Sequence, residues 1–365
     1  MLIKAEFEQR LSELRKRMLS EDRQALLVFS LDNLRYLTNY SGEAAYGIVT
    51  LEKVFLITDY RFMEQAKEEC FDCHLKCRDR DQQSLGQAIR QVLDAQGITR
   101  LLFEAAHINT QVWAGIVQEL NGIIYTASAG LAEDLRKTKD EWEIAQIRKA
   151  AAIADQALQD SLPLIKPGIS ERAFALELEY RMQQLGSEGL SFPSIVGFGP
   201  RSALPHCIPS SRALAEGNLI VIDFGAVING YRSDMTRSFV AGKANAQQRN
   251  IFDTVQRAQQ AALDSLHAGQ IATAVSAAAS NVLQASEFAS HTSTGLGHGV
   301  GIQLHEQPFI SPVCHDTLQT NYVITIEPGI YIPGYGGVRI EDDVVVLADG
   351  YSFISHAPKL FELEI

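Results

Sequence analysis

The stretch Asn218–Val240, NLIVIDFGAVINGYRSDMTRSFV, decides the fold of the larger part of the chain. An apolar, β-branched run leads into Asn229-Gly230, and a second run follows this dipeptide. Asn-Gly between two such runs is the strongest short-range signal for a two-residue hairpin turn. We therefore predict a β-hairpin with Asn229 and Gly230 as its loop.

The predicted turn sets the register of the two strands and thereby the positions of two aspartates. With these loop residues, Asp223 faces Thr236 and Asp234 faces Gly225. The two aspartates are then diagonal neighbours on one face, about 7–8 Å apart at the backbone. Two solvated acids on an exposed face are the simpler alternative. The run around Asp223 is too apolar for an exposed strand, so we favour a cation between the carboxylates.

The composition of the chain excludes several classes of function. Its 365 residues are 46% hydrophobic and 21% charged, which fits a globular protein of two domains. A net charge of −12 without a basic block argues against nucleic acid as a partner. No apolar run approaches the ~20 residues of a membrane span, and the N-terminus lacks the apolar core of a signal peptide. We expect a cytoplasmic protein without a membrane partner.

Cysteine usage fits the same expectation. The 5 cysteines follow no pairing pattern and are typical of free thiols in a reducing compartment. Cys70, Cys73 and Cys77, with His74 among them, raise the alternative of a zinc site. We disfavour it because no second ligand pair follows at zinc-finger spacing.

The chain divides into two predicted domains. In the first part, predicted strands and helices alternate, which is typical of an α/β fold. A polar segment without clear periodicity follows at residues 128–138, and we place the boundary there, giving domains of residues 1–130 and 131–365. The second part separates helices from mainly antiparallel strands and is predicted to be α+β.

Two histidines that are candidate site residues, His298 and His305, follow the hairpin in the sequence. His298 lies among alternate glycines, where other backbone or a ligand can approach closely. A satisfied core histidine is the alternative. His305 is seven residues further on, and an odd separation puts the two on opposite faces of a regular strand. Both can serve one centre only if the strand has a bulge or the site wraps around it.

Two glutamates end apolar runs near the C-terminus. Glu327 follows a buried strand, where an isolated carboxylate is costly unless it is paired, protonated or bound to metal. Glu341 invites the same argument, although an internal ion pair with Arg339 is the simpler alternative. Asp342 and Asp343 follow directly, and one arginine cannot neutralise this cluster together with Glu327. A multivalent cation can.

The candidate ligands are four carboxylates and one imidazole: Asp223, Asp234, His298, Glu327 and Glu341. Hard oxygen donors with a single nitrogen suit manganese, cobalt or a similar divalent ion. The amount of negative charge suggests two ions, which would lie about 3.5–4 Å apart with water or hydroxide between them. Such a pair activates water and polarises a carbonyl, so the predicted reaction class is hydrolysis.

Five segments in order and at fitting spacing carry a family resemblance: Ile222–Gly225, Gly230–Arg237, Gly297–Gly301, Thr325–Gly329 and Val338–Asp342. They resemble the metallopeptidase family with the pita-bread fold, which includes prolidase, aminopeptidase P and methionine aminopeptidase. The first part looks like the creatinase-type N-terminal domain of prolidases. The resemblance covers essentially the whole chain. It implies an α/β creatinase-like domain followed by an α+β pita-bread catalytic domain.

The resemblance also implies roles for the candidate residues. The five ligands would bind two divalent ions, manganese before cobalt or zinc, with Asp234 and Glu341 bridging. Glu327 would in addition act as the general base. His206 and His305 look like the histidines that hold the substrate and stabilise the tetrahedral intermediate.

Within the family, Arg339, Tyr231 and the N-terminal domain resemble the proline-directed branch. This implies an Xaa-Pro dipeptidase or Xaa-Pro aminopeptidase that hydrolyses the N-terminal Xaa-Pro bond of dipeptides or short peptides with metal-activated water. A homodimer is implied as well. The alternatives are a non-catalytic peptide-binding protein on the same fold and an aminopeptidase with non-prolyl specificity.

Three positions depart from the family pattern. Arg201 stands where Asn is commoner in the loop that contains His206, and Leu296 stands where Thr often precedes Gly-His. Asn321-Tyr322 replaces the usual Gly-Met before the Glu327 strand. None of these is a predicted ligand, but the first two lie where a change can alter the substrate pocket.

Overall fold

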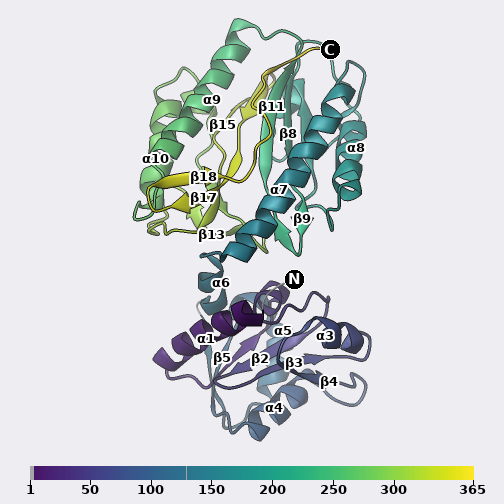
Figure 1. Ribbon diagram of the computed structural model, residues 1–365, viewed down its shortest axis with the longest axis vertical. Coiled ribbons are helices and arrows are strands. Elements are labelled where there is room, and N and C mark those ends of the chain that lie inside the picture. Colours follow the sequence, from purple (N-terminus) through teal and green to yellow (C-terminus); the bar gives the residue numbers. More distant parts are fainter. Residues whose placement is uncertain (1–3, 129) are drawn as a thin grey trace. The chain divides into compact units, whose positions relative to one another are not determined.

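The computed structural model describes residues 4–128 and 130–365, which form two compact units divided between Arg136 and Lys137 (Figure 1). Each unit has its own sheets and its own core. The predicted boundary after residue 130 assigns helix α6 (Leu131–Arg136) to the second domain. In the structure α6 contacts α1 (Lys4–Ser20) and α2 (Leu31–Thr38), so it belongs with the first unit.

The first unit is an α/β domain built on one six-stranded sheet of order β4-β3-β2-β1-β5-β6. Strands β3/β4, β1/β5 and β5/β6 pair in parallel, and the other pairs are antiparallel. Helices α4 (Leu85–Ala95) and α5 (Thr110–Val117) pack over one core of this sheet. The strands are β1 (Ala25–Val28), β2 (Tyr46–Thr50), β3 (Val54–Thr58), β4 (Cys73–Cys77), β5 (Arg100–Phe103) and β6 (Ile124–Ala127).

The cysteine-rich segment that raised the zinc alternative forms strand β4. Residues alternate between the two faces of a strand, so Cys73 and Cys77 lie on one face and His74 on the other. The His74 ring stacks on Phe55 of β3, with the ring centroids 5.1 Å apart. This arrangement does not favour one site that uses the imidazole together with both thiols of the strand.

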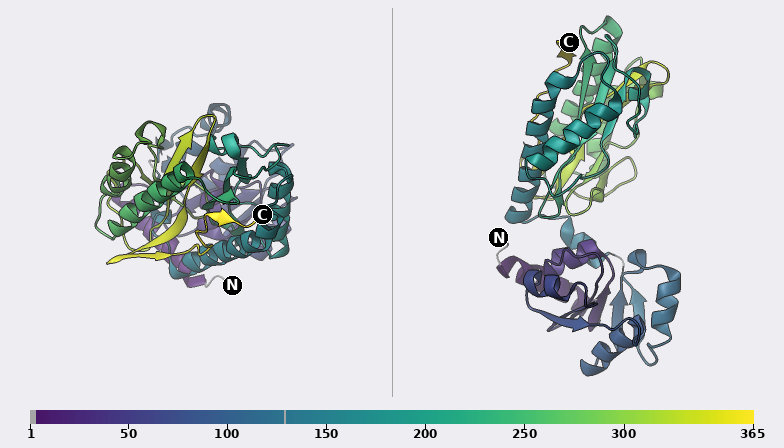
Figure 2. Two further views of the ribbon diagram at one scale, coloured as in Figure 1. Left: turned by 90° about the horizontal axis from the view of Figure 1, so that it is seen from above. Right: turned by 90° about the vertical axis from the view of Figure 1, so that its right-hand side faces the viewer.

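The second unit joins a four-stranded sheet (β19-β11-β8-β7) and a five-stranded sheet (β13-β12-β14-β17-β18). Helices α7 (Glu141–Ser161) and α8 (Glu171–Gln184) pack on the first sheet, and α9 (Ala246–Asp264) and α10 (Ala272–Gln284) pack on the second. Figures 1 and 2 show the two helix pairs on opposite flanks of the strands. The predicted α+β class is confirmed.

The strands of this second unit are mostly antiparallel, and only β11 and β19 pair in parallel. Their bounds are β7 (Ile195–Phe198), β8 (Leu219–Phe224), β9 (Val227–Ile228), β10 (Tyr231–Arg232), β11 (Met235–Ala241), β12 (Gly297–Gly299), β13 (Glu306–Ile310), β14 (Val323–Ile326), β15 (Gly329–Ile332), β16 (Gly336–Arg339), β17 (Asp342–Leu347), β18 (Gly350–Phe353) and β19 (Glu362–Leu363). Among the helices of the described chain, none is long and apolar enough to cross a bilayer.

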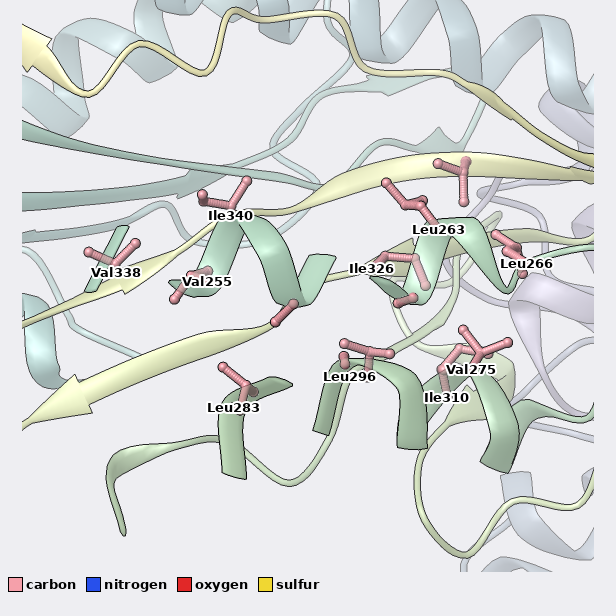
Figure 3. Packing of buried hydrophobic residues seen from close by; sticks show 14 of the residues in the cluster. Val255, Leu263, Leu266, Val275, Leu283, Leu296, Ile310, Ile326, Val338 and Ile340 are labelled. Atoms are coloured by element: carbon pink, nitrogen blue, oxygen red, sulfur yellow. The ribbon is translucent and has the colours of Figure 1, made fainter. Parts of the chain in front are cut away.

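A continuous apolar core fixes α9 and α10 against the strands that carry the candidate site. Figure 3 shows Leu263 of α9 near Ile326 of β14, the residue directly before Glu327, and Val255 of α9 near Val338 and Ile340. Leu296, which precedes Gly297 and His298, is 4% exposed and belongs to this core. The Leu296 side chain therefore packs in the interior and does not line the cavity that His298 reaches.

The hairpin that organises the second unit has the predicted register. Ile228 pairs with Tyr231, and Asp223 pairs with Thr236. Asn229 and Gly230 have φ angles of 49° and 75°. Positive φ at both loop residues is what a type I′ turn requires, and this turn matches the twist of the strands.

Gly225 is required where the hairpin strands approach each other. A Cβ atom at this position would lie 1.9 Å from the carbonyl oxygen of Ser233. We expect Gly225→Ala to lower the free energy of unfolding by about 3 kcal/mol, since backbone must move to admit the methyl group. Gly189→Ala is the matched control, because a Cβ there meets nothing within 4 Å. Equal urea midpoints for the two variants would contradict this prediction.

Candidate active site

A cavity of about 810 Å³ lies in the second unit. Its lining contains every residue that the sequence singles out for chemistry: Asp223, Asp234, His298, Glu327, Glu341, His206, His305 and Arg339. Apolar side chains complete the lining, among them Phe192, Ile195 and Phe309. The structure therefore brings the predicted site residues together around one cavity.

The acidic residues line this cavity because each lies on a strand or directly beside the end of one. Asp223 lies on β8, and Asp234 directly precedes β11, as the hairpin register requires. Glu327 directly follows β14, and Glu341 lies between β16 and β17. His298 lies on β12, which pairs with β14.

Three of the five predicted ligands form the centre of the group. One donor atom from each of Asp234, His298 and Glu341 lies within 4.8 Å of the other two. The Nε2 atom of His298 is 3.5 Å from Asp234 Oδ2 and 3.5 Å from Glu327 Oε1. Glu327 thus adjoins the central three through His298.

Asp223 lies at the edge of the cluster and is the ion-pair partner of Arg339. Arg339 Nη2 donates to Asp223 Oδ2 at 2.5 Å, so an ion pair between Arg339 and Glu341 was the wrong alternative. The second oxygen of Asp223, Oδ1, is buried and has no hydrogen-bond partner among the described residues. A buried carboxylate oxygen without a hydrogen-bond donor is unusual in a protein, and a metal ion bound to it would satisfy this oxygen.

Three carboxyl groups of the cluster have raised pKa values, which a bound cation would lower. Burial, followed by the charges of Glu341 and Asp223, raises the pKa of Asp234 well above its usual range. Burial and the charges of Glu327 and Asp223 do the same to the pKa of Glu341. Burial is also the main cause of the raised pKa of Glu327. A divalent cation would remove this repulsion, and four carboxylates with one imidazole suit such an ion.

His298 is prepared to donate a nitrogen lone pair. Its Nδ1 lies 3.0 Å from the carbonyl oxygen of Gly299, which can only accept a hydrogen bond. We therefore assign the proton to Nδ1, which leaves the Nε2 lone pair facing the carboxylates. Burial lowers the pKa of His298 and favours this neutral form. A neutral imidazole held by its other nitrogen is the usual metal-ligating arrangement.

Two residues to which the sequence analysis gave no positioning role, Thr236 and Asp343, hold the candidate ligands in place. Thr236 Oγ1 donates to Glu341 Oε2 at 2.6 Å and accepts from Arg339 Nε at 2.9 Å. Asp343 Oδ2 accepts from the backbone N–H of Asp234 at 2.8 Å. Thr236 was available from the hairpin register, since it faces Asp223.

Asp342 belongs to a different network from the ligand cluster. Its carboxylate pairs with Arg237 and Lys359, each at 2.7 Å. The sequence had grouped Asp342 with the charges that require a cation. The structure instead neutralises it with two basic side chains, Arg237 from the hairpin and Lys359 near the C-terminus.

The two histidines seven residues apart meet because the strand is irregular. The register of β12 with β13 shifts between His298 and Gly299, as the predicted bulge requires. The ring centroids of His298 and His305 are 4.4 Å apart. His206 reaches the same cavity from a loop that follows β7.

Comparison with known proteins covers both units. A model of "Metallopeptidase family M24" matches residues 145–348, and a model of "Creatinase/Prolidase N-terminal domain" matches residues 10–138. An uncharacterized peptidase, YqhT, of Bacillus subtilis is 35% identical over 334 residues, which cover 92% of this chain and 94% of the relative.

Solved structures are similar over nearly the full length. An Xaa-Pro dipeptidase from Bacillus anthracis superposes with a TM-score of 0.93 at 30% identity, covering 98% of this chain and 100% of its own. An X-Pro aminopeptidase from Thermotoga maritima superposes with a TM-score of 0.88 at 29% identity, covering 95% and 99%. The folds therefore correspond across both units.

Proposed function

The chain belongs to metallopeptidase family M24, and from this premise we propose that it is a proline-directed peptidase with two divalent metal ions. Its proposed reaction is hydrolysis of the bond between the first residue and a proline in second position of dipeptides or short peptides. The observation that carries this proposal is the group of Asp234, His298 and Glu341, whose donor atoms lie within 4.8 Å of one another in the cavity. The similar proteins with known names, a dipeptidase and an aminopeptidase, support the substrate class.

The ions would be held by the four carboxylates and the imidazole, with Asp234 and Glu341 shared between the ions. We propose manganese before cobalt or zinc, because oxygen donors dominate the set. When bound, the ions supply Lewis-acid chemistry that activates water and polarises a carbonyl. The unpartnered Oδ1 of Asp223 and the raised pKa values of Asp234 and Glu341 support a cationic occupant.

The protein side chains would position the substrate and move its proton. Glu327 is the proposed general base, because its side chain is 27% exposed where those of His298 and Asp234 are 8% and 7%. It is therefore the member of the group that opens most to the cavity. His206 and His305 would hold the substrate and stabilise the tetrahedral intermediate by hydrogen bonds.

Arg339 lines the cavity and would connect the ligand cluster with the rest of its wall. Its guanidinium bonds Asp223, Thr236 and the hydroxyl of Tyr331, the last at 2.8 Å from Nη1. Burial raises the pKa of the Tyr331 hydroxyl, so this group stays neutral and polar in the cavity. We propose that Arg339 links the ligand cluster to the substrate-binding side of the pocket.

A small peptide panel tests the proposal. With manganese present, we expect turnover of Ala-Pro or Ala-Pro-Ala and at least about a hundredfold slower turnover of Ala-Ala, because the site recognises the second residue. Ala-Pro alone identifies a dipeptidase, whereas turnover of Ala-Pro-Ala identifies an aminopeptidase. Tight peptide binding without any turnover would favour the non-catalytic alternative. A homodimer, the other proposed property, is tested by sedimentation of the same sample.

A further inference from the structure

We infer that Arg201 is a positioning residue for His206, acting through a clamp with the buried carboxylate of Glu171. The clamp ties together the two ends of residues 199–211, a segment that we call the His206 loop. This inference rests on the proposed function, because that function gives His206 its role at the substrate. Arg201 is one of the positions at which this chain departs from the family pattern, so the device belongs to this chain's own residues.

The Glu171 end of the clamp joins the two ends of the loop. Glu171 is the first residue of α8, and its side chain is fully buried, at 0% exposure. Before the loop, Phe198 N donates to Oε1 at 2.9 Å, and within the loop Arg201 Nε donates to Oε2 at 2.9 Å. At the far end, Ser210 N and Oγ donate to Oε2 at 2.9 and 2.6 Å. One carboxylate thus ties residues on both sides of His206.

The Arg201 end of the clamp reaches the residues directly after His206. Its Nη2 donates to the carbonyl oxygen of Ile208 at 2.5 Å and lies 3.3 Å from Cys207 Sγ. A guanidinium can do this because its donors form a rigid planar fork that serves two acceptors at once. Lysine lacks the fork, and asparagine is too short to bond Glu171 and Ile208 together.

The residue before His206 is fixed from the opposite side. Arg339 Nη1 donates to the carbonyl oxygen of Pro205 at 3.1 Å, while the same guanidinium pairs with Asp223. The main chain at His206 is therefore held between an arginine anchored in the ligand cluster and an arginine anchored on α8. The His206 side chain is exposed to the cavity, so its position depends on this main chain.

The first experiment is a double-mutant cycle on the metal-loaded enzyme. Arg201→Asn is expected to lower kcat/KM for Ala-Pro by about tenfold or more, because a small misplacement of a substrate-holding group is costly. In a His206→Ala background the same substitution should cost less than about twofold, since its target is gone. Arg212→Asn, an exposed arginine just after the loop, is the control and should stay within about twofold of the unaltered enzyme. Independent, additive effects of Arg201→Asn and His206→Ala would overturn the inference.

The second experiment does not depend on catalysis. Cys207 is 1% exposed, so its alkylation by iodoacetamide reports opening of the loop. Arg201→Asn should speed this alkylation by about tenfold or more, with Cys314 as the reference thiol in the same sample. An unchanged Cys207 rate would overturn the clamp. A faster rate in a protein that cleaves no Xaa-Pro peptide would leave the clamp intact and defeat the proposed function instead.

Discussion

Chelation of divalent ions is expected to lower Xaa-Pro turnover by about a thousandfold or more, and added Mn²⁺ or Co²⁺ is expected to restore it. The ions would supply several kcal/mol of transition-state stabilisation, and about 1.4 kcal/mol corresponds to each factor of ten. Without the ions, burial and the neighbouring carboxylates oppose ionisation of Asp234 and Glu341, which is why the pKa of each is raised. The measurement is kcat on Ala-Pro before chelation, after it and after readdition.

Asp234→Asn is the variant that distinguishes two ions from one. As the proposed shared ligand, Asp234 should be needed for a full complement of about two metal ions per chain, measured by elemental analysis. Asp264→Asn, an exposed acid at the end of α9, is the matched control and should retain both ions and activity. A chelated protein that keeps its activity would contradict the metal proposal, and one ion per chain at full activity would contradict the dinuclear one.

Asp234→Asn should not destabilise the apo protein, although it is expected to impair metal binding. A carboxyl whose pKa is raised by folding costs stability at neutral pH, where it would otherwise be ionised. Removing the charge of Asp234 should therefore not lower the unfolding temperature of the apo protein. Added Mn²⁺ should raise that temperature for the unaltered chain more than for Asp234→Asn, because ions that bind only the native state stabilise it.

The hairpin and the candidate ligands were predictable because local chemistry determines them. An Asn-Gly turn fixes the register, and the alternation of a strand then fixes which face Asp223 and Asp234 share. His298 and Glu327 are marked by glycine and proline next to apolar runs. Each signal lies within a few residues, so no knowledge of distant contacts was needed.

Two elements of the first unit, helix α2 and strand β4, depend on distant contacts that the sequence does not show. Helix α2 has only 8 residues; Ser30 caps its N-terminus, and Leu34, Tyr36 and Leu37 are buried in the first unit. Strand β4 has half-buried and exposed residues without an apolar run, and only its pairing with β3 makes it a strand. Pairing of this kind depends on tertiary context more than on propensity.

The partner of Arg339 illustrates the same limit within the site. Spacing of two residues suggested a shared face with Glu341, but β16 ends at Arg339, so Glu341 lies outside that strand. The guanidinium instead reaches Asp223, which is 116 residues away in sequence. The ion-pair partner of a long side chain depends on the tertiary structure, and a single sequence does not indicate which distant residue it will be.

Glu327→Gln is expected to lower kcat on Ala-Pro by about a hundredfold to ten-thousandfold, the usual contribution of a general base. Glutamine has nearly the same shape and keeps an oxygen donor, but it cannot accept the proton. The Michaelis constant should change much less, because the proposed substrate contacts are made by His206 and His305. Kinetics at saturating Mn²⁺ measure both quantities.

Glu341→Gln is the comparison that separates proton transfer from metal binding. Glu341 is 1% exposed and lies among the central three donors, so its loss should deplete metal as well as activity. Glu327→Gln should keep most of the metal, because Glu327 joins that centre only from its edge, 3.5 Å from His298 Nε2. If Glu327→Gln retains both metal and activity, the base must be sought elsewhere. Parallel loss of both, as in Glu341→Gln, would contradict the separate role of Glu327 in proton transfer and leave it only the role of a ligand.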